Sequence, residues 1–67
     1  MELTEIQERL KESGREVGPI QPNSDGTFLL LVDGVYMFYR DGADLVRGRA
    51  TLEQIVTRNA GKNIPIV

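Results

Sequence analysis

The chain has 67 residues, a formal net charge of -2 and 40% hydrophobic residues, and it contains neither cysteine nor histidine. A chain of this length forms one domain with a marginal core, and here neither disulfide bonds nor imidazole ligands are available to stabilise it. The composition therefore excludes a disulfide scaffold and a zinc site of Cys and His, and it leaves oligomerisation as the remaining means of extra stabilisation.

The start of the chain and its longest apolar stretch both indicate where in the cell the protein is expected. The first five residues are acidic and polar, unlike the basic and then apolar start of a signal peptide. The apolar stretch from Phe28 to Tyr39 is interrupted by Asp33 and Gly34 and is too short for a transmembrane helix. We expect a cytoplasmic protein without a membrane-spanning segment.

A first helix is predicted between Thr4 and Gly14. Thr4 and Gln7 have the spacing of a capping box, in which each side chain bonds the backbone N–H of the other residue. Ile6 and Leu10 lie four residues apart and form one narrow apolar stripe. Beyond the helix, residues 17–21 are compatible only with an edge strand or an extended connection, because prolines lie at positions 19 and 22.

Three Asp-Gly dipeptides, at positions 25–26, 33–34 and 41–42, recur eight residues apart in the middle of the chain. Asp-Gly readily adopts the positive φ angles of a two-residue hairpin turn. The mostly apolar intervals between the dipeptides predict strands at 27–32 and 35–40, and a short third strand is expected at 45–47. Together they predict a three-stranded antiparallel β-meander, after which Gly48 bends the chain out of the sheet.

A second helix is predicted from residue 52 to residue 60. Thr51 and Gln54 again have the spacing of a capping box, and Gly61 is a suitable terminator. The apolar stripe of this helix consists of Leu52, Ile55, Val56 and Ala60. Residues 62–67 are apolar for a chain end, and Pro65 restricts them to an edge strand or a packed extended arm.

The predicted hairpin is apolar on both faces. A two-residue turn at 33–34 pairs Leu31 with Tyr36 and Leu29 with Phe38 on one face. The other face pairs Leu30 with Met37 and Phe28 with Tyr39. Two helices of about 15 Å each can cover only one of these faces. The second face must therefore meet the C-terminal arm, a second copy of the chain or a different partner.

These patterns predict one α+β domain over residues 1–67, with both helices on one face of the sheet. The expected function is a non-enzymatic protein-protein interaction module, forming a homodimer that buries one face of the hairpin. The candidate interface comprises Leu29, Leu31, Tyr36 and Phe38. The opposite face, with Phe28, Leu30, Met37 and Tyr39, is almost as good a candidate.

Other functions remain open or are disfavoured by the sequence. Nucleic-acid binding is the main alternative, through Arg40, Arg47, Arg49, Arg58 and Lys62. A modulator protein from a phage or mobile element is suggested only by small size and the absence of catalytic groups. No cofactor site or catalytic residue is predicted, and a calcium loop around Gly26 fails because Gln21 and Val32 occupy the positions that need Asp and Glu.

Overall fold

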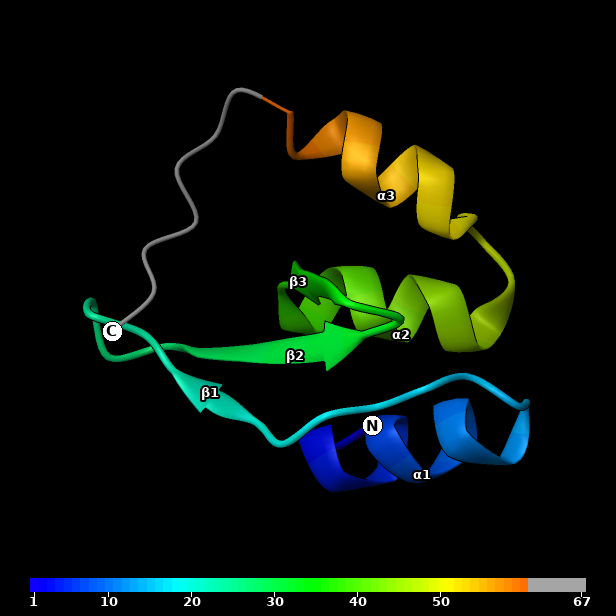
Figure 1. Cartoon of the computed structure of the whole chain (residues 1–67), viewed down its shortest axis with the longest axis horizontal. Helices are drawn as coiled ribbons and strands as arrows, with labels where there is room; N and C mark the ends of the chain where they lie inside the picture. Colours follow the sequence, from blue (N-terminus) through cyan, green and yellow to red (C-terminus); the bar gives the residue numbers. More distant parts are fainter. Residues whose placement is uncertain (61–67) are drawn as a thin grey trace.

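The computed structural model describes residues 1–60 and confirms an α+β fold, with three helices and a three-stranded sheet in this part of the chain (Figure 1). In chain order the elements are α1 (Leu3–Glu12), β1 (Gln21–Pro22), β2 (Phe28–Val32), β3 (Val35–Met37), α2 (Tyr39–Arg47) and α3 (Leu52–Arg58). The predicted C-terminal arm lies outside the described residues. No helix within residues 1–60 has the length and apolar composition needed to span a membrane.

The sheet is an antiparallel meander in the order β1-β2-β3, so the central strand is β2. The turn at Asp33 and Gly34 is confirmed: both residues have positive φ angles, 51° and 78°, as a two-residue hairpin turn requires. The predicted register is confirmed next to the turn, since Leu31 lies opposite Tyr36 and Leu30 lies opposite Met37. The predicted pairs of Phe28 and Leu29 with residues 38–39 do not form, because these two residues pair with β1 and β3 ends at Met37. The chemistry of this turn therefore fixes which side chains share a face.

The turn between β1 and β2 is also confirmed, and it uses side-chain bonds of its own. The N–H of Gly26 donates to the carbonyl oxygen of Asn23 at 3.1 Å. Oδ1 of Asp25 accepts from the backbone N–H of Thr27 at 3.0 Å and from its Oγ1 at 2.6 Å. The turn thus holds Thr27 and the start of β2 in a fixed position relative to Asp25.

The segment before β1 runs along β2 as an extended edge, in agreement with one of its two predicted forms. Val17 forms an isolated antiparallel bridge with Val32, and the N–H of Gly18 donates to the carbonyl of Leu31 at 2.9 Å. A Cβ atom at Gly18 would lie 2.8 Å from Cδ2 of Leu31, so a larger residue here would force the Leu31 side chain to shift.

The prediction for residues 38–47 was wrong. Strand β3 ends at Met37 instead of residue 40, and the expected turn at 41–42 and strand at 45–47 are replaced by one helix, α2. Asp41 lies in the first turn of this helix, and its carboxylate accepts a hydrogen bond from the N–H of Phe38 at 3.3 Å. Gly48 ends α2 with a φ of 71°, as a helix-terminating glycine does, and does not lead out of the sheet.

One of the two predicted capping boxes is confirmed. Thr51 and Gln54 exchange hydrogen bonds of 3.2 Å and 2.9 Å at the start of α3. The box at Thr4 was wrong, because Glu2 is the residue before the first turn of α1 and Thr4 lies inside the helix. The partner expected for Thr4 is occupied elsewhere: the Nε2 group of Gln7 donates to the carbonyl of Gly18 at 3.0 Å and so connects α1 to the edge segment.

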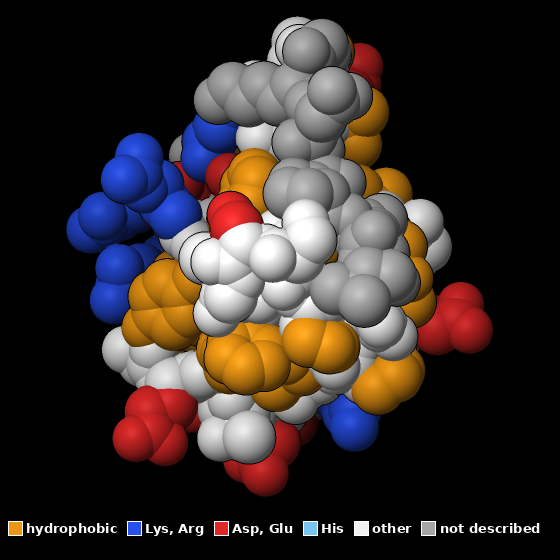
Figure 2. All heavy atoms as spheres, turned by 90° about the vertical axis from the view of Figure 1, so that its left-hand side faces the viewer, with side chains coloured by type: hydrophobic (Ala, Val, Ile, Leu, Met, Phe, Trp, Pro, Cys, Tyr) orange, Lys and Arg blue, Asp and Glu red, His pale blue; other side chains and the backbone are white. Residues whose placement is uncertain are grey.

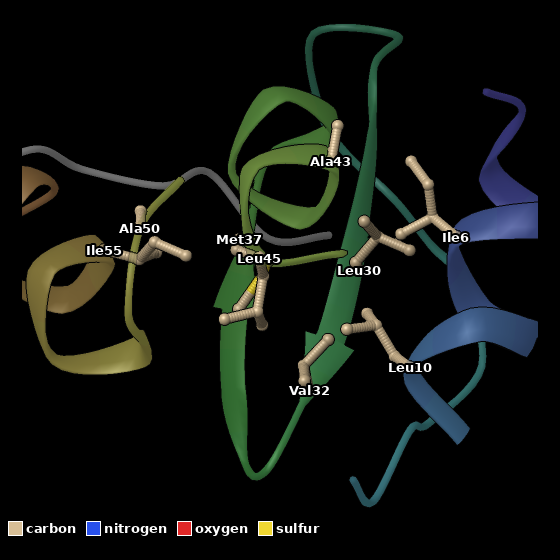
Figure 3. Packing of buried hydrophobic residues seen from close by; sticks show 9 residues of the cluster. All are labelled: Ile6, Leu10, Leu30, Val32, Met37, Ala43, Leu45, Ala50 and Ile55. Atoms are coloured by element: carbon tan, nitrogen blue, oxygen red, sulfur yellow. The ribbon is translucent and has the colours of Figure 1, made fainter. Parts of the chain in front are cut away.

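The main core combines one face of the sheet with side chains from all three helices (Figure 3). Its buried members are Ile6, Leu10, Leu30, Val32, Met37, Ala43, Leu45, Ala50 and Ile55. The stripe predicted for α3 is only partly buried: Ile55 is buried, whereas Val56 is 47% exposed and Ala60 is exposed. The third helix therefore attaches to the domain through few apolar side chains.

Candidate functional site

A groove of about 640 Å³ opens where the start of β2 meets the start of α2 and the end of α3. Three aromatic side chains, Phe28, Phe38 and Tyr39, line it. The other lining residues are Leu3, Thr27, Arg40, Asp41, Arg58 and Asn59. The space-filling view from the side of the β1–β2 turn shows hydrophobic side chains gathered beside Lys and Arg side chains (Figure 2).

The aromatic side chains are exposed because of where their elements begin. Phe28 is the first residue of β2 and is 51% exposed, and Tyr39 is the first residue of α2 and is 43% exposed. Between Met37 and Tyr39 the chain leaves the sheet to start α2. The rings of Phe28 and Tyr39 therefore lack the strand contacts that a longer β3 would give them. The groove is thus a consequence of the short third strand.

The polar side of the groove centres on Asp41, which is only 3% exposed. Its Oδ1 accepts from Nη1 of Arg58 at 2.8 Å, and its Oδ2 accepts from Nδ2 of Asn59 at 3.0 Å. The same Nη1 of Arg58 donates to Oδ2 of Asp44 at 3.1 Å. The hydrogen bonds to Asp44 and Asp41 raise the pKa of Arg58 above its ordinary value. These contacts fasten the end of α3 to α2 and keep the carboxylate of Asp41 fully hydrogen-bonded.

Two exposed residues of opposite charge lie near the aromatic side chains: Asp25, which bonds to the groove residue Thr27, and Arg40, which lines the groove. Arg40 is exposed next to Tyr39 and has no ion pair within residues 1–60. Asp25 is exposed in the turn before β2, and the hydrogen bonds from Thr27 hold the pKa of its carboxyl below the ordinary value. Both side chains are therefore accessible to solvent.

The structure separates the residues of the predicted interface. Leu29 has no exposed surface, and Leu31 and Tyr36 lie side by side on that face and are half-buried. Phe38 lies in the groove instead. The opposite face is divided in the same way: Leu30 and Met37 belong to the core, while Phe28 and Tyr39 line the groove.

The predicted basic residues also fall into two places. Arg40 and Arg58 line the groove, whereas Arg47, the last residue of α2, and Arg49 lie exposed on either side of Gly48. Lys62 lies outside the described residues. The sequence did not reveal the bonds among Asp41, Arg58 and Asn59, which depend on α2. The signal available for the end of this helix was the pair Arg47 and Gly48, since a basic residue followed by a glycine is typical of a helix C-terminus.

The groove combines exposed aromatic side chains with hydrogen-bonded polar side chains. Within residues 1–60 no group of three or more His, Cys, Asp or Glu side chains is placed to hold a metal ion. A comparison with protein-family models, curated proteins and solved structures finds no significant match. Function is therefore inferred from the groove itself.

Proposed function

We propose that the protein is a non-enzymatic protein-protein interaction module that docks a second copy of the chain on the aromatic groove, forming a homodimer. The observation that carries the proposal is the exposure of two large aromatic side chains, Phe28 and Tyr39, in one groove with Phe38. Aromatic side chains that can be fully desolvated supply most of the binding free energy of protein interfaces. A cytoplasmic location, expected from the sequence, is part of the proposal.

The size of the chain strengthens the case for association. Full burial of one large apolar side chain contributes about 1.5 to 3 kcal/mol, so covering the exposed halves of Phe28 and Tyr39 contributes about 2 kcal/mol in each copy. A small domain has a total stability of only about 5 to 15 kcal/mol. Dimerisation through the groove would therefore stabilise the fold itself, in a chain that has no disulfide bonds.

The polar groups of the groove favour binding over catalysis. Asp41 already accepts hydrogen bonds from Arg58, Asn59 and the backbone of Phe38, so its carboxylate is engaged in holding α2 and α3 together. A general base needs a lone pair directed at a substrate proton. The role we assign to the groove is therefore recognition alone.

Sedimentation velocity over a wide range of protein concentrations tests the proposal. We expect a reversible dimer, and we expect Phe28→Ser and Tyr39→Ser each to raise the dissociation constant by at least about 10-fold. Val56→Ser is the matched control, because Val56 is 47% exposed but is not among the groove residues. It should leave the dissociation constant unchanged. A folded monomer at high micromolar concentration, or an equal effect of Val56→Ser, would contradict the proposal.

Nucleic-acid binding is the second candidate, and the exposure of Arg40, Arg47 and Arg49 supports it. Arg58 contributes less, because it is paired with both Asp41 and Asp44. This candidate predicts binding to duplex or single-stranded oligonucleotides that weakens steeply with salt. The absence of any gel shift at low salt would exclude it.

A further inference from the structure

The groove is bordered by an acid and a base that the domain does not pair with each other. Asp25 uses Oδ1 to hold Thr27, while Oδ2 has no hydrogen-bond partner within residues 1–60. Arg40 likewise has no ion pair in that part of the chain. Thr27 lines the groove on the side of Asp25, and Arg40 lines it on the side of α2. The surface thus carries one unpaired charge of each sign beside the same aromatic groove.

We propose that two copies of the chain associate about a twofold axis running between the start of β2 and the start of α2, so that Arg40 of each copy pairs with the partner's Asp25. This inference rests on the proposed homodimer and specifies its symmetry and its charged contacts.

The symmetry argument starts from the order of residues on the two segments. In a twofold dimer every contact occurs twice. If a first residue of one copy contacts a second residue of its partner, then the second residue of the first copy contacts the first residue of the partner. Phe28 follows Asp25 by three residues, and Tyr39 directly precedes Arg40. A twofold dimer that places Arg40 of each copy against the partner's Asp25 therefore also brings Phe28 toward the partner's Tyr39. Acid then meets base and aromatic meets aromatic on both sides of the axis.

The charges favour a second copy of this chain over an unrelated partner. The chain carries both members of the complementary pair on one surface, so a copy supplies both charges that the surface needs. Arg58, the other cation of the groove, is already paired with Asp41 and Asp44, and Arg40 therefore remains as the group that selects a carboxylate. A docking that placed Arg40 against Arg40 would be opposed by like-charge repulsion.

Charge reversal tests the pairing by sedimentation velocity or native mass spectrometry. Arg40→Asp and Asp25→Arg should each weaken the homodimer about 10-fold or more, because both contacts of the dimer become repulsive. Mixing the two variants should restore a heterodimer, in which each contact again joins opposite charges. The double variant should restore the homodimer. Absence of rescue in the mixture, while both variants remain folded by circular dichroism, would overturn the pairing.

A milder set of variants covers the case in which Asp25→Arg damages the turn. Asp25→Asn keeps an oxygen that can accept from Thr27, so it removes the charge and retains the turn. Asp25→Asn and Arg40→Gln should each weaken the dimer about 2- to 5-fold per contact at low salt. The double variant should be no weaker than either single variant, and strictly additive effects would contradict the pairing.

The outcomes separate this inference from the proposed function. A wild-type chain that stays monomeric and folded would contradict both. A wild-type dimer that depends on Phe28 and Tyr39 but does not respond to the charge variants would leave the homodimer standing and overturn the pairing of Arg40 with Asp25. Rescue in the mixture supports both.

Discussion

Nη1 of Arg58 lies 2.8 Å from Oδ1 of Asp41, which connects the last residue of α3 to the first turn of α2. The acid is almost fully buried, and the base is partly exposed at the edge of the groove. Because α3 contributes few apolar side chains to the core, this contact and the bond from Asn59 are major attachments of the third helix. Asp41 is therefore a structural residue as much as a groove residue.

Replacing Asp41 with alanine should lower the free energy of unfolding by about 2 kcal/mol, because partly buried donors on Asn59 and on the backbone of Phe38 lose their acceptor. Asp41→Asn should cost less, since one oxygen remains to accept. Urea denaturation followed by far-ultraviolet circular dichroism, at a fixed protein concentration, measures both changes. A loss below about 0.5 kcal/mol for Asp41→Ala would show that the contacts to α3 contribute little.

Gly42→Ala should destabilise the fold although alanine is the better helix former by about 1 kcal/mol. A Cβ atom at this position would overlap Cδ1 of Leu30 and lie 3.2 Å from Cγ2 of Ile6, and both of these side chains are fully buried. Overpacking of this kind costs about 1 to 3 kcal/mol.

A second variant tests whether Gly42→Ala destabilises the fold through overlap with Leu30. Leu30→Val shortens the side chain that the new methyl group would meet, so the double variant should be more stable than the sum of the two single effects predicts. Thermal or urea unfolding of the four proteins gives the coupling. Additive effects would mean that the methyl group does not meet Leu30.

Thr51→Ala should lower the free energy of unfolding by about 1 kcal/mol, because Thr51 accepts from the N–H of Gln54 at the start of α3. Thr4→Ala is the matched control. Thr4 has the same spacing to a glutamine in sequence, but it lies inside α1, and its replacement should have little effect. Equal losses for the two variants would contradict the assignment of only one functional cap. Urea denaturation distinguishes the two outcomes.

Asp33 should make stability depend on pH in the acidic range. Its carboxylate accepts from the N–H of Glu16 at 2.9 Å and from Arg15 at 2.8 Å, and these bonds lower the pKa of Asp33 below its ordinary value of 3.8. A carboxyl whose pKa is lower in the folded state stabilises the fold above the unfolded-state pKa, and that stabilisation is lost as the pH falls through the folded-state pKa.

Asp33→Asn isolates this contribution, since asparagine tolerates the positive φ of 51° at this position. The wild-type chain should have the higher melting temperature at neutral pH, and the difference should shrink as the pH falls below about 4. Melting temperatures measured between neutral pH and pH 2 provide the test. A difference that stays constant over this range would contradict a role for the charge.

The β2–β3 hairpin could be predicted from sequence because its determinants are local. Asp33 and Gly34 both adopt positive φ, and a two-residue turn leaves only one register for the flanking strands. The start of α3 was predictable for the same reason, since Thr51 and Gln54 interact within one helical turn. Such short-range contacts do not depend on where the rest of the chain lies.

Helix α2 was not predicted because its Asp-Gly dipeptide has a different role from the other two. Asp41 accepts from a backbone N–H, as turn aspartates do, but the bond closes the first turn of a helix. Gly42 is required by the close approach of Leu30 and Ile6, which belong to other elements. The groove depends on the same helix, so its position could be found only from the tertiary structure.

The bonds between α2 and α3 also set the lifetime of the groove. Arg58 and Asn59 belong to its wall and at the same time hold the end of α3 to Asp41. If α3 opens locally, the wall opens with it, and under the proposed homodimer the binding-competent fraction of molecules would equal the fraction in which the helix is docked. The amide hydrogen-exchange rates of α3 in the free protein thus report how often the groove is incomplete, and slower exchange in the complex would measure how strongly a partner closes it.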